Sequence, residues 1–194
     1  MSIINKLIIF FFIFLTFSKV CSESVNKLDF IWKDGLIYKK NSDIPFTGEL
    51  IKKKDKGFFL NGKPEGKWLR YFDNGKIHIK YYYLNGKKNG LWETYYRHGQ
   101  LRVKETWING SRQGKFEYYY ENGNLKIKGK YKNGKKEGSW EYYHPNGYIK
   151  ERGNYIEGKK EGIWKLFFMN GNLRTIYTYK KNEIINSHSD IKIY

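Results

Sequence analysis

Residues 61–84 decide the fold of this protein, and they read NGKPEGKWLRYFDNGKIHIKYYYL. The pattern returns four times at a constant spacing of 24 residues. Five full units therefore follow one another over 61–84, 85–108, 109–132, 133–156 and 157–180. A degenerate unit around Phe46-Thr47-Gly48 precedes them, and residues 181–194 begin a sixth unit that loses its glycines. This constant spacing predicts a repeat array with atypical ends, because each end unit has a neighbour on one side only.

Two kinds of glycine position divide each unit into strands. Gly62 and Gly66 of the first unit, with their equivalents, are expected to mark a loop between successive hairpins. Asn74-Gly75 is expected to form a two-residue type I′ turn, because Asn-Gly tolerates the positive φ that both central positions need. Aromatic residues flank these positions and favour strands. Each unit is therefore predicted to be one antiparallel β-hairpin.

Counting outward from the Asn-Gly turn predicts which residues face each other across a hairpin. A shift by one residue would place the aromatic side chains against the basic ones, whereas this register pairs unlike charges. The predicted pairs are Trp68 with Tyr81, Phe72 with Ile77 and Asp73 with Lys76, and in later units Glu93 with Lys104, Glu117 with Lys128 and Glu141 with Arg152.

Alternation along the strands predicts a sheet with two different faces. One face carries Trp68 and its equivalents, and the other carries the Glu–Lys pairs, the Tyr71-type tyrosines and a basic column that begins at His78. The sequence therefore predicts an all-β protein, an elongated antiparallel meander of hairpins behind an N-terminal signal helix. An aromatic face without a second layer needs a cover, which makes it the candidate surface for a partner. Its candidate residues are Trp68, Trp92, Phe116, Trp140, Trp164, Tyr83, Trp107, Tyr131 and Tyr155.

The formal net charge of +18, from 37 basic and 19 acidic residues, predicts attraction to anionic partners. Lysines that keep an aromatic sheet soluble explain the same charge. The candidate basic surface joins the strand column to the lysines of the glycine-rich loops. Its residues are Arg102, Lys126, Lys150, Arg174, Lys87, Lys88, Lys135, Lys136, Lys159 and Lys160. Anionic lipid or an envelope polymer is an alternative ligand for this surface, and an exported protein is not expected to bind nucleic acid.

Residues with catalytic or metal-binding chemistry do not converge in the sequence. The four histidines lie at unlike positions of different units, without a spacing that suits a metal site. Each of the glutamates Glu93, Glu117 and Glu141 has a cation opposite, which suits setting the register better than acid–base chemistry. We therefore expect neither an enzyme nor a cofactor nor a bound metal.

The first 22 residues are typical of a secretory signal peptide. Lys6 precedes an apolar run of 11 residues from Leu7 to Phe17, and this run is shorter than the about 20 residues of a membrane-spanning helix. Cleavage is expected near Ser22, with export to the periplasm, the cell surface or the exterior, and lipidation of Cys21 is the alternative. The predicted organisation is a signal peptide over 1–22, a lead-in with a degenerate first repeat over 23–60, five repeats over 61–180 and a degenerate cap over 181–194.

The recurring pattern G-x-W-x-x-Y-Y-x-N-G-x-L, with Y-x-N-G-K-x-x-G after it, resembles the MORN repeat variant family over about residues 46–180. The lead-in over 34–48 also resembles the way such proteins begin. The resemblance implies an elongated β-hairpin array that serves as a protein-interaction or membrane-apposed scaffold without a cofactor. Bacterial members carry the label of YwqK-type antitoxins, which implies an antitoxin-like component of a toxin–antitoxin system.

These observations favour a non-catalytic scaffold of the cell envelope or exterior that binds a protein partner through an aromatic and basic sheet surface. Peripheral binding to anionic lipid or envelope polymer through the Lys-rich loops is the first alternative. The two differ in their response to salt, because charge-driven binding weakens as ionic strength rises and aromatic docking persists. An antitoxin-like role is a further alternative that requires a silent signal peptide, and self-association is a further partner class.

Overall fold

The structure is a computed structural model, and it describes residues 30–52 and 54–188. The expected signal peptide and its helix lie outside the described residues. Within these ranges the chain forms strands and turns, which confirms the predicted all-β class. Among the described residues, none belongs to a helix that is long and apolar enough to cross a bilayer.

The described strands form one large sheet and one small hairpin. β1 (Phe30–Lys33) pairs with β2 (Leu36–Lys39) apart from the rest. The other 14 strands form an antiparallel sheet in chain order, with β7 paired to β6 beside β8. They are β3 (Gly48–Ile51), β4 (Asp55–Leu60), β5 (Lys63–Tyr71), β6 (Ile77–Leu84), β7 (Lys87–Lys88), β8 (Gly90–Tyr95), β9 (Leu101–Ile108), β10 (Ser111–Tyr119), β11 (Leu125–Lys132), β12 (Lys135–Tyr143), β13 (Ile149–Ile156), β14 (Lys159–Phe167), β15 (Leu173–Lys180) and β16 (Glu183–His188).

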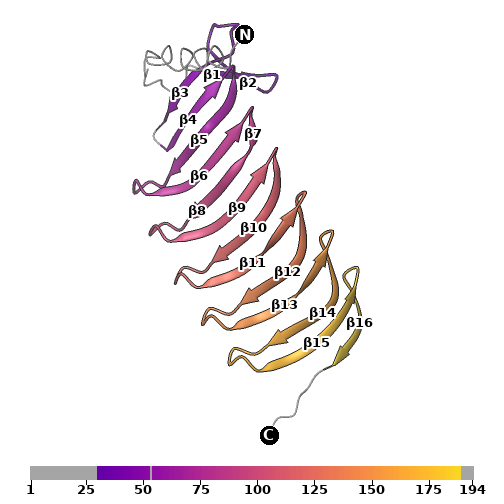
Figure 1. Cartoon of the computed structure of the whole chain (residues 1–194). Helices are drawn as coiled ribbons and strands as arrows, with labels where there is room; N and C mark the ends of the chain where they lie inside the picture. The colour runs from indigo at the N-terminus through magenta and orange to yellow at the C-terminus, as the bar shows by residue number, and fades with distance from the viewer. Residues whose placement is uncertain (1–29, 53, 189–194) are drawn as a thin grey trace, which may run out of the picture.

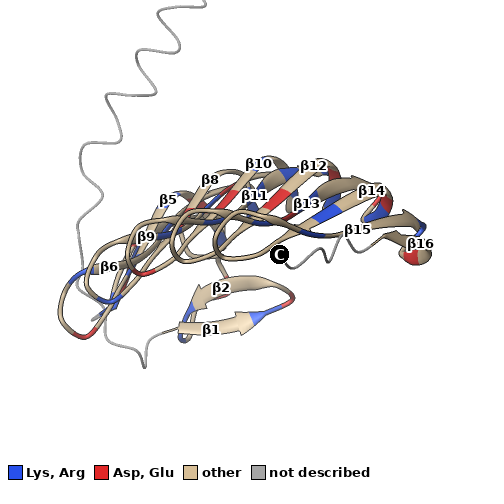
Figure 2. Cartoon of the chain, turned by 90° about the horizontal axis from the view of Figure 1, so that it is seen from below, with Lys and Arg blue, Asp and Glu red and all other residues tan. Residues whose placement is uncertain are grey.

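The predicted meander of hairpins is confirmed. Each hairpin lies beside the next along an extended ribbon, and the strands bend so that the sheet curves (Figure 1). β1 and β2 lie beneath the arch of the sheet at its N-terminal end (Figure 2). Among the described residues, the ribbon therefore has one face that β1 and β2 partly cover and an opposite face without such a cover.

The two-residue type I′ turns lie between the units, where the sequence predicted a loop. Asn85 and Gly86 have φ values of 49° and 77°, and Leu84 pairs directly with Lys87 on the other side of the turn. Gly90, which was expected to close that loop, lies at the start of β8 instead. We call these the connecting turns, and they comprise Asn61-Gly62, Asn85-Gly86, Asn109-Gly110, Asn133-Gly134 and Glu157-Gly158.

The Asn-Gly turns inside the units, which we call the hairpin turns, are not type I′ as predicted. At the first of them Gly75 has a φ of 79°, whereas Asn74 keeps a negative φ. Gly75 N donates to Phe72 O over 3.0 Å, which closes a three-residue loop. The Asn74 side chain is used differently, since its Nδ2 donates to Arg97 O of the next unit over 3.1 Å. This bond joins neighbouring units at the wider turn.

The wider turn shifts the pairing near it, and a bulge then restores the predicted register. Phe72 N donates to Lys76 O over 2.8 Å, so the expected pairs Phe72 with Ile77 and Asp73 with Lys76 are wrong. Tyr71 pairs with Ile77 and Arg70 with Ile79, which leaves His78 as the extra residue of a β-bulge. Beyond the bulge, the confirmed pairs are Trp68 with Tyr81, Glu93 with Lys104, Glu117 with Lys128 and Glu141 with Arg152.

The core consists of aromatic rings on one face of the sheet, which we call the aromatic face and define by Trp68, Trp92, Phe116, Trp140 and Trp164. Two buried clusters lie along it. The N-terminal cluster joins Trp68 and Tyr81 to Ile37 of β2, Leu50 and Phe59. The C-terminal cluster consists of Trp140, Tyr155 and Trp164, with half-buried rings around it. Within the described part of the chain, one sheet therefore encloses its core without a second layer over most of its length.

Candidate functional site

The candidate aromatic residues divide into core and surface. Trp140 and Trp164 are 1% and 0% exposed, and Trp68 is also buried, so these three indoles belong to the core. Trp92 and Phe116 hold the same position in the second and third units and are half-buried. Among the remaining candidates, Tyr155 is buried and Tyr83, Trp107 and Tyr131 are half-buried. A partner on this face would therefore meet the rings of the second and third units first.

Cationic side chains lie across these rings. Lys88 Nζ is 4.0 Å from the ring centroid of Trp92 and 4.2 Å from that of Trp107. Such distances allow attraction between a cation and a ring. The equivalent contacts in later units are Arg112 with Trp107 and Tyr131, Lys136 with Trp140 and Tyr155, and Lys160 with Trp164 and Tyr179. We call Lys88, Arg112, Lys136 and Lys160 the cover cations, since they take the place of a second layer.

Glu105 interrupts the row of rings with a buried carboxylate. It is 5% exposed, and it stands where other units have glycine or tyrosine. Trp107 Nε1 donates to Glu105 Oε1 over 2.9 Å. Arg112 Nε lies 2.8 Å from Glu105 Oε2, at an angle that makes an ion pair rather than a hydrogen bond. The sequence analysis did not single out Glu105. An acid at a position that holds glycine or tyrosine in the other units was the signal that could have identified it.

The basic column contacts the aromatic side of the sheet, although the sequence placed it on the opposite face. The pairing of the strands skips Arg102 and Lys126, which makes them bulge residues like His78. A bulge bends its strand and re-aims a side chain. Lys126 Nζ lies 4.7 Å from the ring of Tyr118, which shares the aromatic face with Phe116 two residues before it. Lys150 and Arg174 occupy the same bulge position in the later hairpins.

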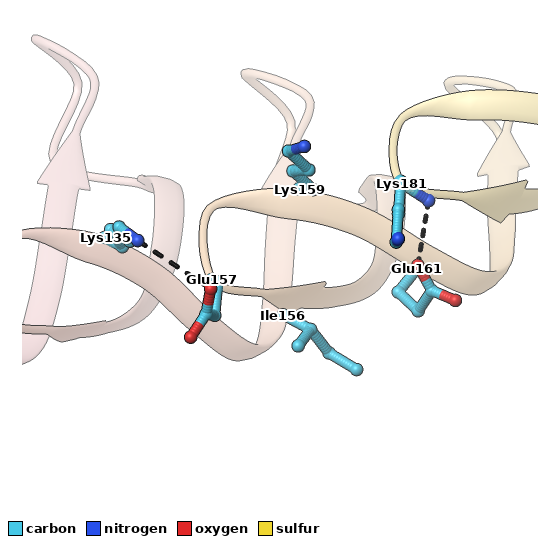
Figure 3. Close-up of a pocket in the computed structure, with 6 residues that line it drawn as sticks. All are labelled: Lys135, Ile156, Glu157, Lys159, Glu161 and Lys181. Atoms are coloured by element: carbon cyan, nitrogen blue, oxygen red, sulfur yellow. Dashed lines mark hydrogen bonds and ion pairs between the residues drawn. The ribbon is translucent and has the colours of Figure 1, made fainter.

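The connecting turns carry acids together with their lysines. Lys87, Lys135 and Lys159 are exposed there. Lys135 Nζ lies 3.8 Å from Glu157 Oε2, and Lys181 N donates to Glu161 Oε2 over 2.8 Å. These groups line a hollow of about 570 Å³ at the last connecting turns (Figure 3). Its lining residues are Lys135, Ile156, Glu157, Lys159, Glu161 and Lys181. This edge is therefore mixed in charge rather than a uniform row of cations.

The opposite face, which we call the charged face and define by Glu93, Lys104, Glu117, Lys128 and Glu141, alternates acids with lysines from strand to strand. Glu93 Oε2 accepts a hydrogen bond from Lys80 Nζ over 2.9 Å, and Glu141 Oε2 lies 2.7 Å from Lys128 Nζ. Each of these lysines belongs to the preceding hairpin. The ion pairs therefore join successive units, whereas the sequence predicted partners within one hairpin.

Neighbouring groups set the ionisation of the charged face. Burial disfavours ionised Glu141, but hydrogen bonds from Lys128 and Tyr143 and the charge of Arg152 outweigh it and lower the pKa of Glu141. The Lys128 ammonium donates to Glu141 and to the Tyr143 hydroxyl, and these hydrogen bonds raise the pKa of Lys128. Both groups are therefore held in their charged forms near neutral pH.

The histidines of the described chain make structural contacts at separate places. The His78 ring stacks on Phe72 with centroids 4.2 Å apart, and burial together with the charges of Arg70 and Arg102 lowers its pKa. The His144 ring bonds Phe167 O over 3.1 Å. Within residues 30–52 and 54–188, no three acidic, histidine or cysteine side chains gather as metal ligands would.

Comparison with known proteins identifies the repeat. A model of the MORN repeat variant matches five consecutive segments, 64–85, 88–109, 112–133, 136–157 and 160–181, which together make up more than half of the chain. No curated protein matches the chain. Among solved structures, a GtfA/B complex bound to UDP and GlcNAc is similar at 15% identity over 69% of this chain, with a TM-score of 0.21. The matched part spans 24% of that protein, and at this TM-score the likeness carries no argument.

Proposed function

Because this chain belongs to the MORN repeat variant family, we propose that it is a non-catalytic scaffold that binds a protein partner through its aromatic face. The family is generally non-catalytic. One observation supports the surface most directly: flexible cations rather than a second layer cover the rings of Trp92 and Trp107. Side chains that cover a ring in this way can move aside for a partner, whereas a packed layer cannot.

The proposal places the protein in the cell envelope or outside the cell. The apolar run from Leu7 to Phe17 and the expected cleavage near Ser22 support export. Mass spectrometry of the amino terminus in each cell fraction tests this location. An uncleaved terminus in the cytosolic fraction would instead favour the antitoxin-like role, since a cytoplasmic toxin needs an antagonist in the same compartment.

Peripheral binding to anionic lipid or envelope polymer is the second candidate. The exposed lysines Lys87, Lys135 and Lys159 of the connecting turns favour it. Glu157 and Glu161 lie among them and reduce the positive potential of that edge. The aromatic face is therefore the better supported surface.

Capture from envelope extract tests the proposed surface. The protein is compared with Trp92→Leu and Trp107→Tyr, and Trp107→Tyr installs the residue that the other units carry at that position. Trp32→Leu is the matched control, because Trp32 lies on β1, outside the five repeats, and is 61% exposed. We expect capture that persists at high salt and is lost in the two repeat variants only. Capture that disappears with salt and ignores both tryptophans would move the function to the lysines of the connecting turns.

A further inference from the structure

The first unit covers its rings in a different way from the units that follow. At the position of the cover cations it has Pro64, which pairs with Phe59. The β1–β2 hairpin lies over the rings there instead. Ile37 of β2 is 3% exposed in the cluster that contains Phe59 and Trp68. Ile37 N also donates to Gly62 O of the first connecting turn over 3.0 Å, which anchors the hairpin by its backbone.

The same kind of aromatic ring is therefore covered by an extended segment of the chain in the first unit and by a cationic side chain in the later units. In the first unit, where β1–β2 lies over the rings, proline occupies the position of the cover cations. In the later units, where no strand of the described chain lies over the rings, the stem of a lysine or arginine covers them. A lysine stem can leave a ring by rotation about its own bonds, without any change of the backbone. The aromatic face of the later units is thus shaped to accept an extended segment, once the cover cations move.

The charges around these rings indicate what kind of segment would move them. Arg112 and Lys160 already have carboxylates, with Arg112 Nε 2.8 Å from Glu105 and Lys160 Nζ 2.5 Å from Glu151. Lys88 and Lys136 have no carboxylate within ion-pair distance in the described part of the chain. Lys136 Nζ donates to the Tyr142 hydroxyl over 2.9 Å, and Lys88 contacts rings.

The other border of the same face repeats this excess of positive charge. Lys126 Nζ lies 4.7 Å from the ring of Tyr118 and 5.1 Å from that of Tyr120, and the Arg102 guanidinium lies 5.6 Å from the ring of Tyr96. Neither cation forms an ion pair within residues 30–52 and 54–188. From the second to the fourth unit, the rings therefore lie between two lines of cations. Arg112 pairs with Glu105, whereas Lys88, Lys136, Arg102 and Lys126 have no ion-pair partner among the described residues.

We propose that this part of the aromatic face binds an extended acidic segment of a partner protein, whose carboxylates draw Lys88 and Lys136 off the rings and whose aliphatic side chains replace them. The inference rests on the proposed function and adds the chemistry of the partner. Ile37 on the first unit shows the type of side chain that the rings accept. A carboxylate holds an ammonium more strongly than a ring face does, so an acidic segment gains from the exchange.

Fluorescence anisotropy with two labelled decapeptides tests the inference. In one peptide Asp alternates with Val, and in the other Asp alternates with Ser, so that both carry the same charge. We expect the Asp–Val peptide to bind the protein about tenfold more tightly than the Asp–Ser peptide, because only its valines can cover the rings. Equal binding of the two peptides would overturn the inference, since it would show attraction to any polyanion, a lipid headgroup plane included.

Paired lysine variants locate the site. Lys88→Met with Lys136→Met removes two ammonium groups at the rings and keeps apolar stems over them. Lys87→Met with Lys135→Met makes the same change of net charge at exposed neighbours. We expect the first pair to weaken binding of the Asp–Val peptide about tenfold and the second pair by less than about twofold. An equal loss in both pairs would contradict the inference.

Tryptophan fluorescence of the wild type should also change when the Asp–Val peptide binds, since Lys88 leaves the indoles of Trp92 and Trp107. An unchanged tryptophan emission spectrum when the peptide binds would contradict the proposed displacement of Lys88 from the indoles. The inference and the proposed function can fail separately. Capture that needs Trp92 and Trp107, without binding of either peptide, would keep the partner-binding face and remove the acidic segment. Absence of both capture and peptide binding would remove both.

Discussion

The indole of Trp140 lies flat against Gly129 on the neighbouring strand, so closely that a Cβ at residue 129 would stand 2.2 Å from Cδ2 of the ring. The same contact joins Trp68 to Gly57 and Trp164 to Gly153. Each glycine lacks the side chain that would lift the indole from the sheet. This pairing explains how a single sheet buries Trp140 and Trp164 almost completely without a second layer.

Gly129→Ala should therefore destabilise the protein by about 1–3 kcal/mol, because the added methyl group overlaps the ring of Trp140. Urea denaturation followed by circular dichroism measures the change. In a Trp140→Phe background the cost of Gly129→Ala should fall by about 1 kcal/mol or more, since the smaller ring leaves room. The same cost in both backgrounds would show that the glycine is needed for another reason.

The protein should tolerate the loss of the buried Glu105 carboxylate when residues 105 and 116 are both replaced by the glycine and tryptophan that later units carry there. Glu105→Gly alone leaves a gap beside Phe116 and takes the carboxylate away from Arg112, and we expect it to cost about 2–4 kcal/mol. Adding Phe116→Trp rebuilds the Gly129–Trp140 arrangement in this unit and should recover at least about 1 kcal/mol of that loss. A double variant whose midpoint in urea is no higher than that of Glu105→Gly would argue against the equivalence of the two arrangements.

The two kinds of turn should respond differently to glycine. Asn133 has a φ of 50°, so Asn133→Ala should cost about 1 kcal/mol and Asn133→Gly almost nothing. Asn122 Nδ2 donates to Pro145 O over 3.0 Å, so Asn122→Ala and Asn122→Gly should each cost about 1 kcal/mol. Thermal denaturation of the four variants separates these cases. If glycine rescued position 122 as well, the Asn122 side chain would have no role between units.

Stability should depend on pH through Glu141. Its pKa is lowered from 4.5 in the folded protein, so the stabilising effect of its charge is complete above pH 4.5 and disappears as pH falls through the lower folded value. Wild type should exceed Glu141→Gln by about 1 kcal/mol in unfolding free energy at pH 7, and this difference should shrink as the pH falls below 4.5 toward the lowered pKa of folded Glu141. Urea midpoints at pH 7, 5 and 3.5 measure this. A difference that stays constant over this range would exclude the ion pair with Lys128 as its source.

The repeat spacing was sufficient to predict the class of fold, the meander and most of the register. Asn-Gly pairs and alternating aromatic residues are local signals, and they recur in every unit. The cross-strand pairs of Glu93, Glu117 and Glu141 could be predicted although the turn type was wrong. Strands that share one buried face cannot shift by one residue without exchanging both faces, and a bulge takes up the extra residue of the wider turn.

The assignment of turn types could not be predicted in the same way, because two candidate turns compete within each unit. In the first, third and fourth units both turns contain Asn-Gly, which satisfies the local preference for positive φ at either place. Contacts between units accompany both kinds of turn, since Asn74 Nδ2 donates to Arg97 O of the next hairpin and Asn85 N donates to the Glu65 carboxylate of the previous one. The sequence of one unit contains neither partner.

By itself, the sequence determined that this chain is a ribbon of β-hairpins with aromatic residues on one face, since periodicity and turn chemistry act within one unit. Only the tertiary structure decided which of those aromatic residues a partner can reach. Burial depends on neighbours from other strands, and Gly129 and Lys136 enclose Trp140 while Trp92 stays half-buried against Tyr81. The placement of the cations over the rings follows from the same cause, because the flexible methylene stem of a lysine or arginine takes the direction that the packing around it leaves open.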